Sequence, residues 1–65
     1  MKYKKAIQYY EDNKTEIEKD KRLIAKELVQ AYNYEKAYSN YTSMFYFAII
    51  VRDYKKLKEL YPCVK

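Results

Sequence analysis

The chain has 65 residues, a formal net charge of +5, no glycine, no histidine and a single cysteine. A chain of this length forms one small domain, which buries only about 60% of the surface that its unfolded state exposes. One cysteine excludes an internal disulfide, and the absence of histidine excludes most zinc sites. We therefore expect a domain of low stability, which a partner subunit would increase.

The missing glycines also bear on the fold class. Hairpin turns and phosphate-binding loops usually require glycine, whereas helices joined by short polar connections do not. The sequence therefore predicts an all-α fold, with residues 1–65 forming a single helical domain. We expect a small three-helix bundle that also forms a dimer.

The first predicted helix spans residues 2–12. Its apolar residues recur at i, i+3, i+4 and i+7, which is the spacing of one helical face. They are Tyr3, Ala6, Ile7 and Tyr10. The polar segment 11–14 then precedes Thr15 and Glu18, whose spacing matches a capping box at a new helix start. Neither glycine nor proline enforces a break here, so the alternative is one continuous rod, which would make the fold a helical hairpin.

The second predicted helix spans residues 15–39. Its apolar face consists of Ile17, Ile24, Ala25, Leu28, Val29 and Tyr32. Glu18 and Arg22 form a supporting pair at i and i+4. Beyond Tyr32 the apolar pattern shifts, because Glu35 falls where that face would continue. The shifted pattern consists of Ala31, Tyr34, Tyr38 and Tyr41. We expect either a bend here or a different packing partner for the second half of this helix.

The third predicted helix spans residues 43–61. Small polar residues at 39–43 favour a turn before it, and Pro62 ends it because the residue before a proline avoids helical angles. Its core face consists of Phe47, Ile50, Val51, Tyr54, Leu57 and Tyr61. The apolar run 44–51 alone would also suit a buried strand, but the pattern continues at helical spacing. This run is far shorter than the roughly 20 residues of a membrane span, so we expect no membrane association.

The composition is unfavourable for catalysis. Without histidine, acid–base catalysis near neutral pH needs a carboxyl or lysine with a strongly shifted pKa, in a pocket that so short a chain rarely encloses. Cys63 has no histidine to activate its thiol. We therefore expect a protein that is not an enzyme, with no catalytic residue, no metal, no cofactor and no small-molecule substrate.

The start of the third helix carries more apolar surface than one core face requires. Phe45 and Ile49 lie nearly opposite that face, and Tyr46 lies on its flank. A helix that is apolar all round is normally buried on all sides, and two neighbouring helices cannot surround a third. We interpret these three residues as a contact with another protein or with a second copy of the chain. The alternative is that the first helix covers them.

Tyrosines near the second turn form a further candidate for protein binding. Tyrosine is enriched at the energetic centres of interfaces, and Tyr34, Tyr38 and Tyr41 lie close in sequence to the apolar start of the third helix. Tyrosines at the boundary of a bundle, with their hydroxyls in water, need no such function. Both interpretations of these residues stay open at this point.

Direct nucleic-acid binding is the alternative function. The lysines near the helix termini are Lys2, Lys4, Lys5, Lys55, Lys56 and Lys58. If the first and third helices lie side by side, these lysines would form a basic face for phosphates. Lysine is poorly suited to bidentate recognition, and no helix-turn-helix pattern is present. A lysine-rich solvated surface is the ordinary outcome for such residues.

The sequence thus predicts a small regulator or adaptor that acts by binding another protein, itself, or both. Its many lysine, tyrosine, isoleucine and asparagine residues indicate an AT-rich coding sequence, as in a low-GC bacterium, its plasmids or its phages. This suits a phage or mobile-element protein that modulates or inhibits a host protein. The single cysteine, with no hydrophobic leader after Met1, predicts a cytoplasmic location.

Overall fold

Residues 2–38 and 40–61, the part of the chain that the computed structural model describes, form four helices and no strand. The helices are α1 (Lys2–Asp12), α2 (Lys14–Lys19), α3 (Leu23–Tyr38) and α4 (Tyr41–Leu60). The predicted all-α bundle is confirmed. Ser39, Pro62 and Cys63, which enter the sequence predictions, lie outside the described residues, as does the side chain of Lys2.

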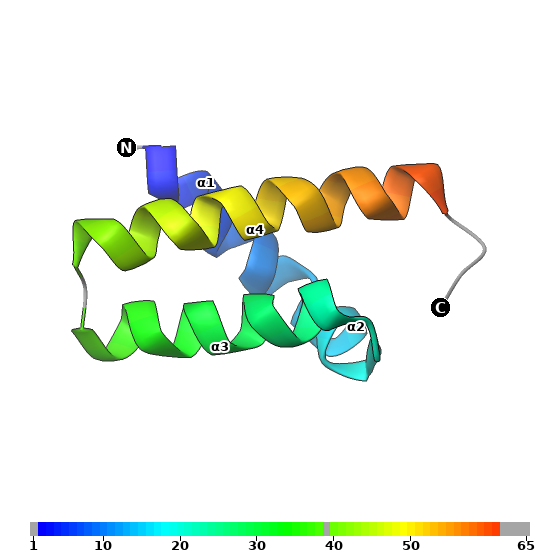
Figure 1. The fold of residues 1–65 in the computed structure, drawn as a ribbon, viewed down its shortest axis with the longest axis horizontal. Coiled ribbons are helices and arrows are strands. Elements are labelled where there is room, and N and C mark those ends of the chain that lie inside the picture. The colour runs from blue at the N-terminus through cyan, green and yellow to red at the C-terminus, as the bar shows by residue number, and fades with distance from the viewer. Residues whose placement is uncertain (1, 39, 62–65) are drawn as a thin grey trace.

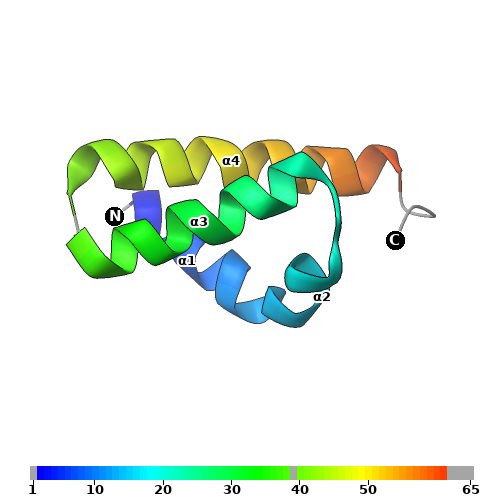
Figure 2. The ribbon, with the colours of Figure 1, turned by 60° about the horizontal axis from the view of Figure 1, so that its bottom comes forward.

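The longest packing contact is between α3 and α4, which run antiparallel and side by side (Figure 1). α1 begins near the α3–α4 turn and crosses α4 at an angle, and the short α2 connects it to the start of α3 (Figure 2). The result is an elongated bundle of 35 × 19 × 18 Å. No helix in residues 2–38 and 40–61 is both long and apolar enough to cross a membrane.

Three aromatic rings from three helices meet at the centre of the core. Tyr10 of α1 stacks on Tyr32 of α3 with ring centroids 4.1 Å apart, and Phe47 of α4 meets these two rings at 6.2 and 5.7 Å. Burial raises the pKa of Tyr10 above its ordinary value, as does the nearby Glu18 carboxylate. Each of these aromatic residues belongs to a face that the apolar periodicity predicts.

The junction between α1 and α2 is a single residue, Asn13. Its backbone and side-chain nitrogens both donate to the carbonyl of Tyr9, at 3.1 and 2.8 Å. Its own carbonyl accepts from the amide of Ile17 at 2.9 Å. The break between the first two helices therefore exists, but the predicted capping box is wrong. Asn13 is the N-cap, with no side-chain capping bond, and both Thr15 and Glu18 are exposed helical residues.

A second break, between α2 and α3, replaces the continuous helix that we expected over 15–39. The Asp20 side chain accepts a hydrogen bond from the backbone amide of Arg22 at 2.9 Å, and the Asp20 backbone is extended, with φ −76° and ψ 129°. A side chain that bonds the amide two residues on stabilises a turn in competition with the helix. The predicted pair of Glu18 and Arg22 is also wrong, because Arg22 pairs with Asp20.

The predicted shift of the apolar face within this region is wrong as well. α3 keeps one buried face from Ala25 to Glu35, and that face includes Ala31 and the carboxyl-bearing Glu35, which is only 4% exposed. Tyr34 and Tyr38 point away from the core. The tyrosines that suggested a shift thus lie on the exposed side of α3.

α4 begins two residues before the predicted position. Asn40 is its N-cap, and the side-chain oxygen of Asn40 accepts from the amide of Ser43 at 2.9 Å. The Ser43 hydroxyl donates to the Asn40 carbonyl at 3.1 Å. This arrangement satisfies amides that would otherwise have no partner at the first turn of the helix. It also fixes where the chain turns from α3 into α4.

Candidate protein-binding surface

Five exposed aromatic residues gather at the end of the bundle where α3 ends and α4 begins. Their exposed fractions lie between 50% and 79%. The five residues, which we call the aromatic surface, are Tyr34, Tyr38, Tyr41, Phe45 and Tyr46. The rings of Tyr34 and Tyr38 contact each other, with centroids 4.5 Å apart. The part of the chain that turns from one long helix into the next therefore presents rings to solvent.

An open groove of about 400 Å³ runs between α3 and α4 within this surface. Tyr34 of α3 and Tyr46 of α4 line it from opposite sides. The other lining residues are Glu27, Gln30, Ala31, Asn40, Thr42 and Ser43. Most of these carry a hydroxyl or an amide, which can both donate and accept hydrogen bonds. The groove thus combines aromatic walls with neutral polar groups.

The outward face of α4 changes character along its length. Phe45 is exposed and Ile49 is half-buried, whereas the second half of this face carries Arg52, Asp53 and Lys56, all exposed. The second half is thus the ordinary solvated side of a surface helix. The exposed aromatic residues of α4 therefore lie in its first half, whereas in its second half Leu60, at the end of the helix, is the large apolar residue that is exposed.

The structure exposes most of the residues that the sequence predicts for protein binding. Phe45, Tyr46, Tyr34 and Tyr41 are exposed, and Ile49 is half-buried. The alternative, in which α1 covers Phe45 and Tyr46, is not realised in the isolated chain. Tyr38, the third tyrosine of the candidate group near the second turn, is also exposed and belongs to this surface.

The aromatic surface lies in an uncharged stretch of a highly charged chain. Charged residues make up 35% of the sequence, yet no Lys, Arg, Asp or Glu occurs between Lys36 and Arg52. Four of the five aromatic residues fall in this interval, and Tyr34 precedes it. Depletion of charge is typical of the buried centre of a protein interface. The same depletion is unusual for residues that solvent surrounds.

The lysines proposed for nucleic-acid binding have different environments. α1 does pack against α4, and Lys4, Lys5, Lys55 and Lys56 are exposed. The Lys55 ammonium lies 5.5 Å from the ring centre of Tyr9, in a cation–π contact. Lys58, in contrast, is partly buried and forms an ion pair with Glu16 of α2. Its charge is therefore already partnered within the chain.

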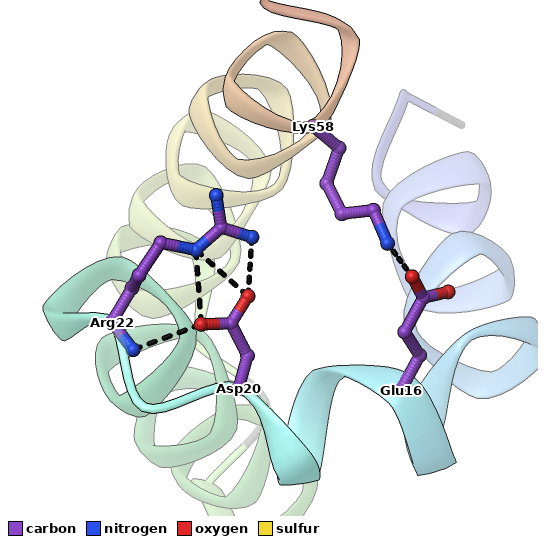
Figure 3. Close-up of polar contacts among 4 residues, drawn as sticks. All are labelled: Glu16, Asp20, Arg22 and Lys58. Atoms are coloured by element: carbon purple, nitrogen blue, oxygen red, sulfur yellow. Dashed lines mark hydrogen bonds and ion pairs between the residues drawn. The ribbon is translucent and has the colours of Figure 1, made fainter. Parts of the chain in front are cut away.

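A polar cluster ties α2 to the rest of the bundle at the opposite end (Figure 3). The Asp20 carboxylate, only 7% exposed, accepts two hydrogen bonds from Arg22 Nε at 2.9 and 2.8 Å. The hydrogen bonds from the Arg22 guanidinium hold the pKa of Asp20 below its ordinary value. Lys58 of α4 reaches across to Glu16 of α2 in the same view. These contacts hold the short helix in place.

Tyr54 packs beside this cluster. The Arg22 guanidinium carbon lies 5.5 Å from the Tyr54 ring centre, and burial, followed by the charge of Asp20, raises the pKa of the Tyr54 hydroxyl. That hydroxyl is buried near the Asp20 and Arg22 side chains, whose charges both act on it. Within the same part of the chain, no group of three or more cysteines and carboxylates could hold a metal ion. The cluster is best explained as structural.

Comparison with known proteins adds no relative to this description. No protein-family model, curated protein or solved structure matches the chain. The role of the aromatic surface must therefore be inferred from its residues and their exposure.

Proposed function

We propose that this protein is a small regulator or adaptor, without catalytic activity, that binds another protein through its aromatic surface. The observation that supports the proposal is the exposure of five aromatic side chains at one end of the bundle. Soluble monomers rarely expose contiguous apolar patches of this kind, and such patches mark interaction sites. Tyrosine and phenylalanine are also enriched in interfaces over the rest of the protein surface.

The amount of exposed surface suits an interface. At about 150–250 Å² for each aromatic side chain, the exposed fractions correspond to roughly 450–750 Å² in the isolated chain. A standard protein interface buries about 800 Å² on each partner. The aromatic surface with the walls of its groove is therefore large enough to form most of one side of a specific complex.

A regulatory role suits the rest of the chain. It has no histidine for proton transfer near neutral pH, and the buried carboxylate of Asp20 belongs to a cluster that stabilises α2. An AT-rich coding bias and small size support an origin in a phage or mobile element, where such a protein would modulate or inhibit a host protein. A single cysteine supports a reducing, cytoplasmic location.

The test is capture of a partner from the native cell with matched variants. Phe45→Glu places a charge in the aromatic surface. Thr15→Glu adds the same charge at an exposed position of α2, at the other end of the bundle. We expect a crosslinked partner to be enriched with the wild type and with Thr15→Glu, and to be reduced about tenfold or more with Phe45→Glu. Equal recovery with both variants would refute this role of the surface.

Nucleic-acid binding is the second candidate, supported by the packing of α1 on α4, which brings two pairs of exposed lysines onto adjacent helices. Binding to phosphates weakens steeply with salt because bound cations are released. The affinity for a fluorescent oligonucleotide should therefore fall by about tenfold or more between roughly 50 and 200 mM salt. At the lower salt concentration, the double variant of Lys55→Glu with Lys56→Glu should bind the oligonucleotide more weakly than the wild type. A flat salt response would eliminate this candidate.

A further inference from the structure

We infer that the aromatic surface binds the same surface on a second copy of the chain, so that the two copies form a two-fold symmetric dimer. This inference rests on the proposed function, because it names the partner of the same surface. It commits to a partner that the proposed function leaves open. Three properties of the surface support a second copy.

The first property is the distribution of charge. Each chain carries a net charge of +5, so two copies repel unless the surfaces in contact are neutral. The interval between Lys36 and Arg52 is uncharged, and the exposed lysines of α1 and of the second half of α4 lie outside it in sequence, although Lys4 of α1 lines a hollow together with Met44 of this interval. An acidic partner would find no cation within this interval to pair with. A neutral surface can contact another copy of itself without repulsion between like charges.

The second property is shape. In a two-fold interface one surface meets its own copy, so it must present both projections and a recess. Tyr41 and Phe45 project with exposed fractions of 79% and 59%. The groove of about 400 Å³ is lined by Tyr34 and Tyr46, two other members of the aromatic surface, and is a recess for a ring of the second copy. Projection and recess therefore lie on the same end of the bundle.

The third property is the chemistry of the polar groups. Gln30, Asn40 and Thr42 line the groove, and their amides and hydroxyl both donate and accept hydrogen bonds. Such groups can pair with the same groups of a second copy, whereas lysine or glutamate at these positions would meet like charge. The one carboxylate in the lining, Glu27, lies on α3 away from the turn.

The closing experiment measures association of the purified full-length chain by sedimentation equilibrium from about 1 μM to 1 mM. We expect the wild type and Thr15→Glu to form dimers with the same Kd. Phe45→Glu should weaken the dimer by about 30-fold or more, as expected for a residue at the energetic centre of an interface. Tyr41→Glu, at the most exposed of the five positions, should act in the same direction.

Two further measurements make the result specific to this surface. Circular dichroism at each concentration checks that both variants keep the helical content of the wild type, which we expect because both positions are exposed. Amide chemical shifts that change with wild-type concentration should come from residues 30–49, which include the groove. A dimer that neither substitution weakens, or shifts confined to α2, would overturn the inference, since the copies would then meet through another surface.

The outcomes also separate this inference from the proposed function. A monomeric wild type, together with a different protein whose capture depends on Phe45, would overturn the dimer and leave the proposed function intact. A monomeric wild type with no partner sensitive to Phe45→Glu would overturn both. A dimer that Phe45→Glu and Tyr41→Glu weaken while Thr15→Glu does not supports both the surface and its partner.

Discussion

Asp20 is a polar residue that the fold buries and provides with partners. Its carboxylate accepts from the backbone amide and from the guanidinium of Arg22. A buried charge is costly unless it is paired and hydrogen-bonded, and here one neighbour satisfies both requirements. The same bonds explain why the pKa of Asp20 lies below its ordinary value of 3.8. The charged form of Asp20 therefore stabilises the link between α2 and α3.

Replacement of Asp20 by Asn should lower the free energy of unfolding by about 1–2 kcal/mol at neutral pH, since it removes charge-assisted hydrogen bonds. Because the pKa of Asp20 is lower in the folded than in the unfolded state, its contribution is complete above the unfolded value near 3.8. It is lost as the pH falls through the folded value. Urea denaturation should thus give a constant difference between wild type and variant near neutral pH, and a shrinking one below about pH 4.

Asp53→Asn is the matched control for this measurement. Asp53 also lies beside an arginine, with Asp53 Oδ1 3.3 Å from Arg52, but both side chains are largely exposed. Exposed ion pairs contribute about 0–1 kcal/mol, so this control should change stability little at any pH. A difference for Asp20→Asn that persists undiminished into strong acid would contradict the assignment of its effect to the carboxylate charge.

At the scale of elements, the apolar periodicity predicts the buried faces of the helices more accurately than it predicts the positions at which the helices break. α1 has the predicted bounds, and α4 begins two residues before the predicted position because Asn40 supplies its cap. The break at residues 20–22 has no glycine or proline to announce it. Ile17 and Ile24 are seven residues apart and keep helical spacing whether or not the chain turns between them. The signal that exists is Asp20, a residue that bonds its own backbone in turns.

The aromatic surface was predictable in part. Phe45 and Tyr46 were identifiable from a single helix, because they exceed what one core face requires. The groove beside them depends on how α3 pairs with α4, so Gln30 and Thr42 carry no signal in the sequence. Tyr34 and Tyr38 were also identifiable as a pair, since Tyr38 follows Tyr34 by one helical turn and lies on the same side of α3.

Asn40→Ala should lower the free energy of unfolding by about 1 kcal/mol, because the amide of Ser43 loses its side-chain acceptor at the first turn of α4. Thr42→Ala is the control. Thr42 is exposed in the same turn, and its hydroxyl forms no hydrogen bond with another described residue. Thermal and urea denaturation of both variants check this. Equal stability of the two variants would show that the cap contributes nothing in solution.

At the scale of the whole molecule, the rings of Tyr10, Tyr32 and Phe47 hold the helices together. These rings join α1, α3 and α4, and Phe47 is fully buried. A domain of 65 residues has a free energy of unfolding of only about 3–10 kcal/mol. A single contact at this centre is therefore a large part of the stability of the fold.

Phe47 and Phe45 provide a test within one helix. Phe47→Ala should cost about 3–5 kcal/mol, the usual range for a buried aromatic residue, and should leave much of the chain unfolded. Phe45→Ala should cost less than about 1 kcal/mol, because most of its ring is already in water. Circular dichroism with urea denaturation measures both at low protein concentration. Similar losses for the two variants would contradict the placement of one ring inside and the other outside.

The uncharged interval between Lys36 and Arg52 has a practical consequence for protein chemistry. Trypsin cleaves after lysine and arginine, so it leaves residues 37–52 as one fragment, the longest that it releases from this chain. That fragment carries Tyr38, Tyr41, Phe45 and Tyr46 together. A label, a crosslink or protection from modification on any of these four residues would therefore appear in the mass of a single peptide, whereas one on Tyr34 would appear in the peptide of residues 27–36.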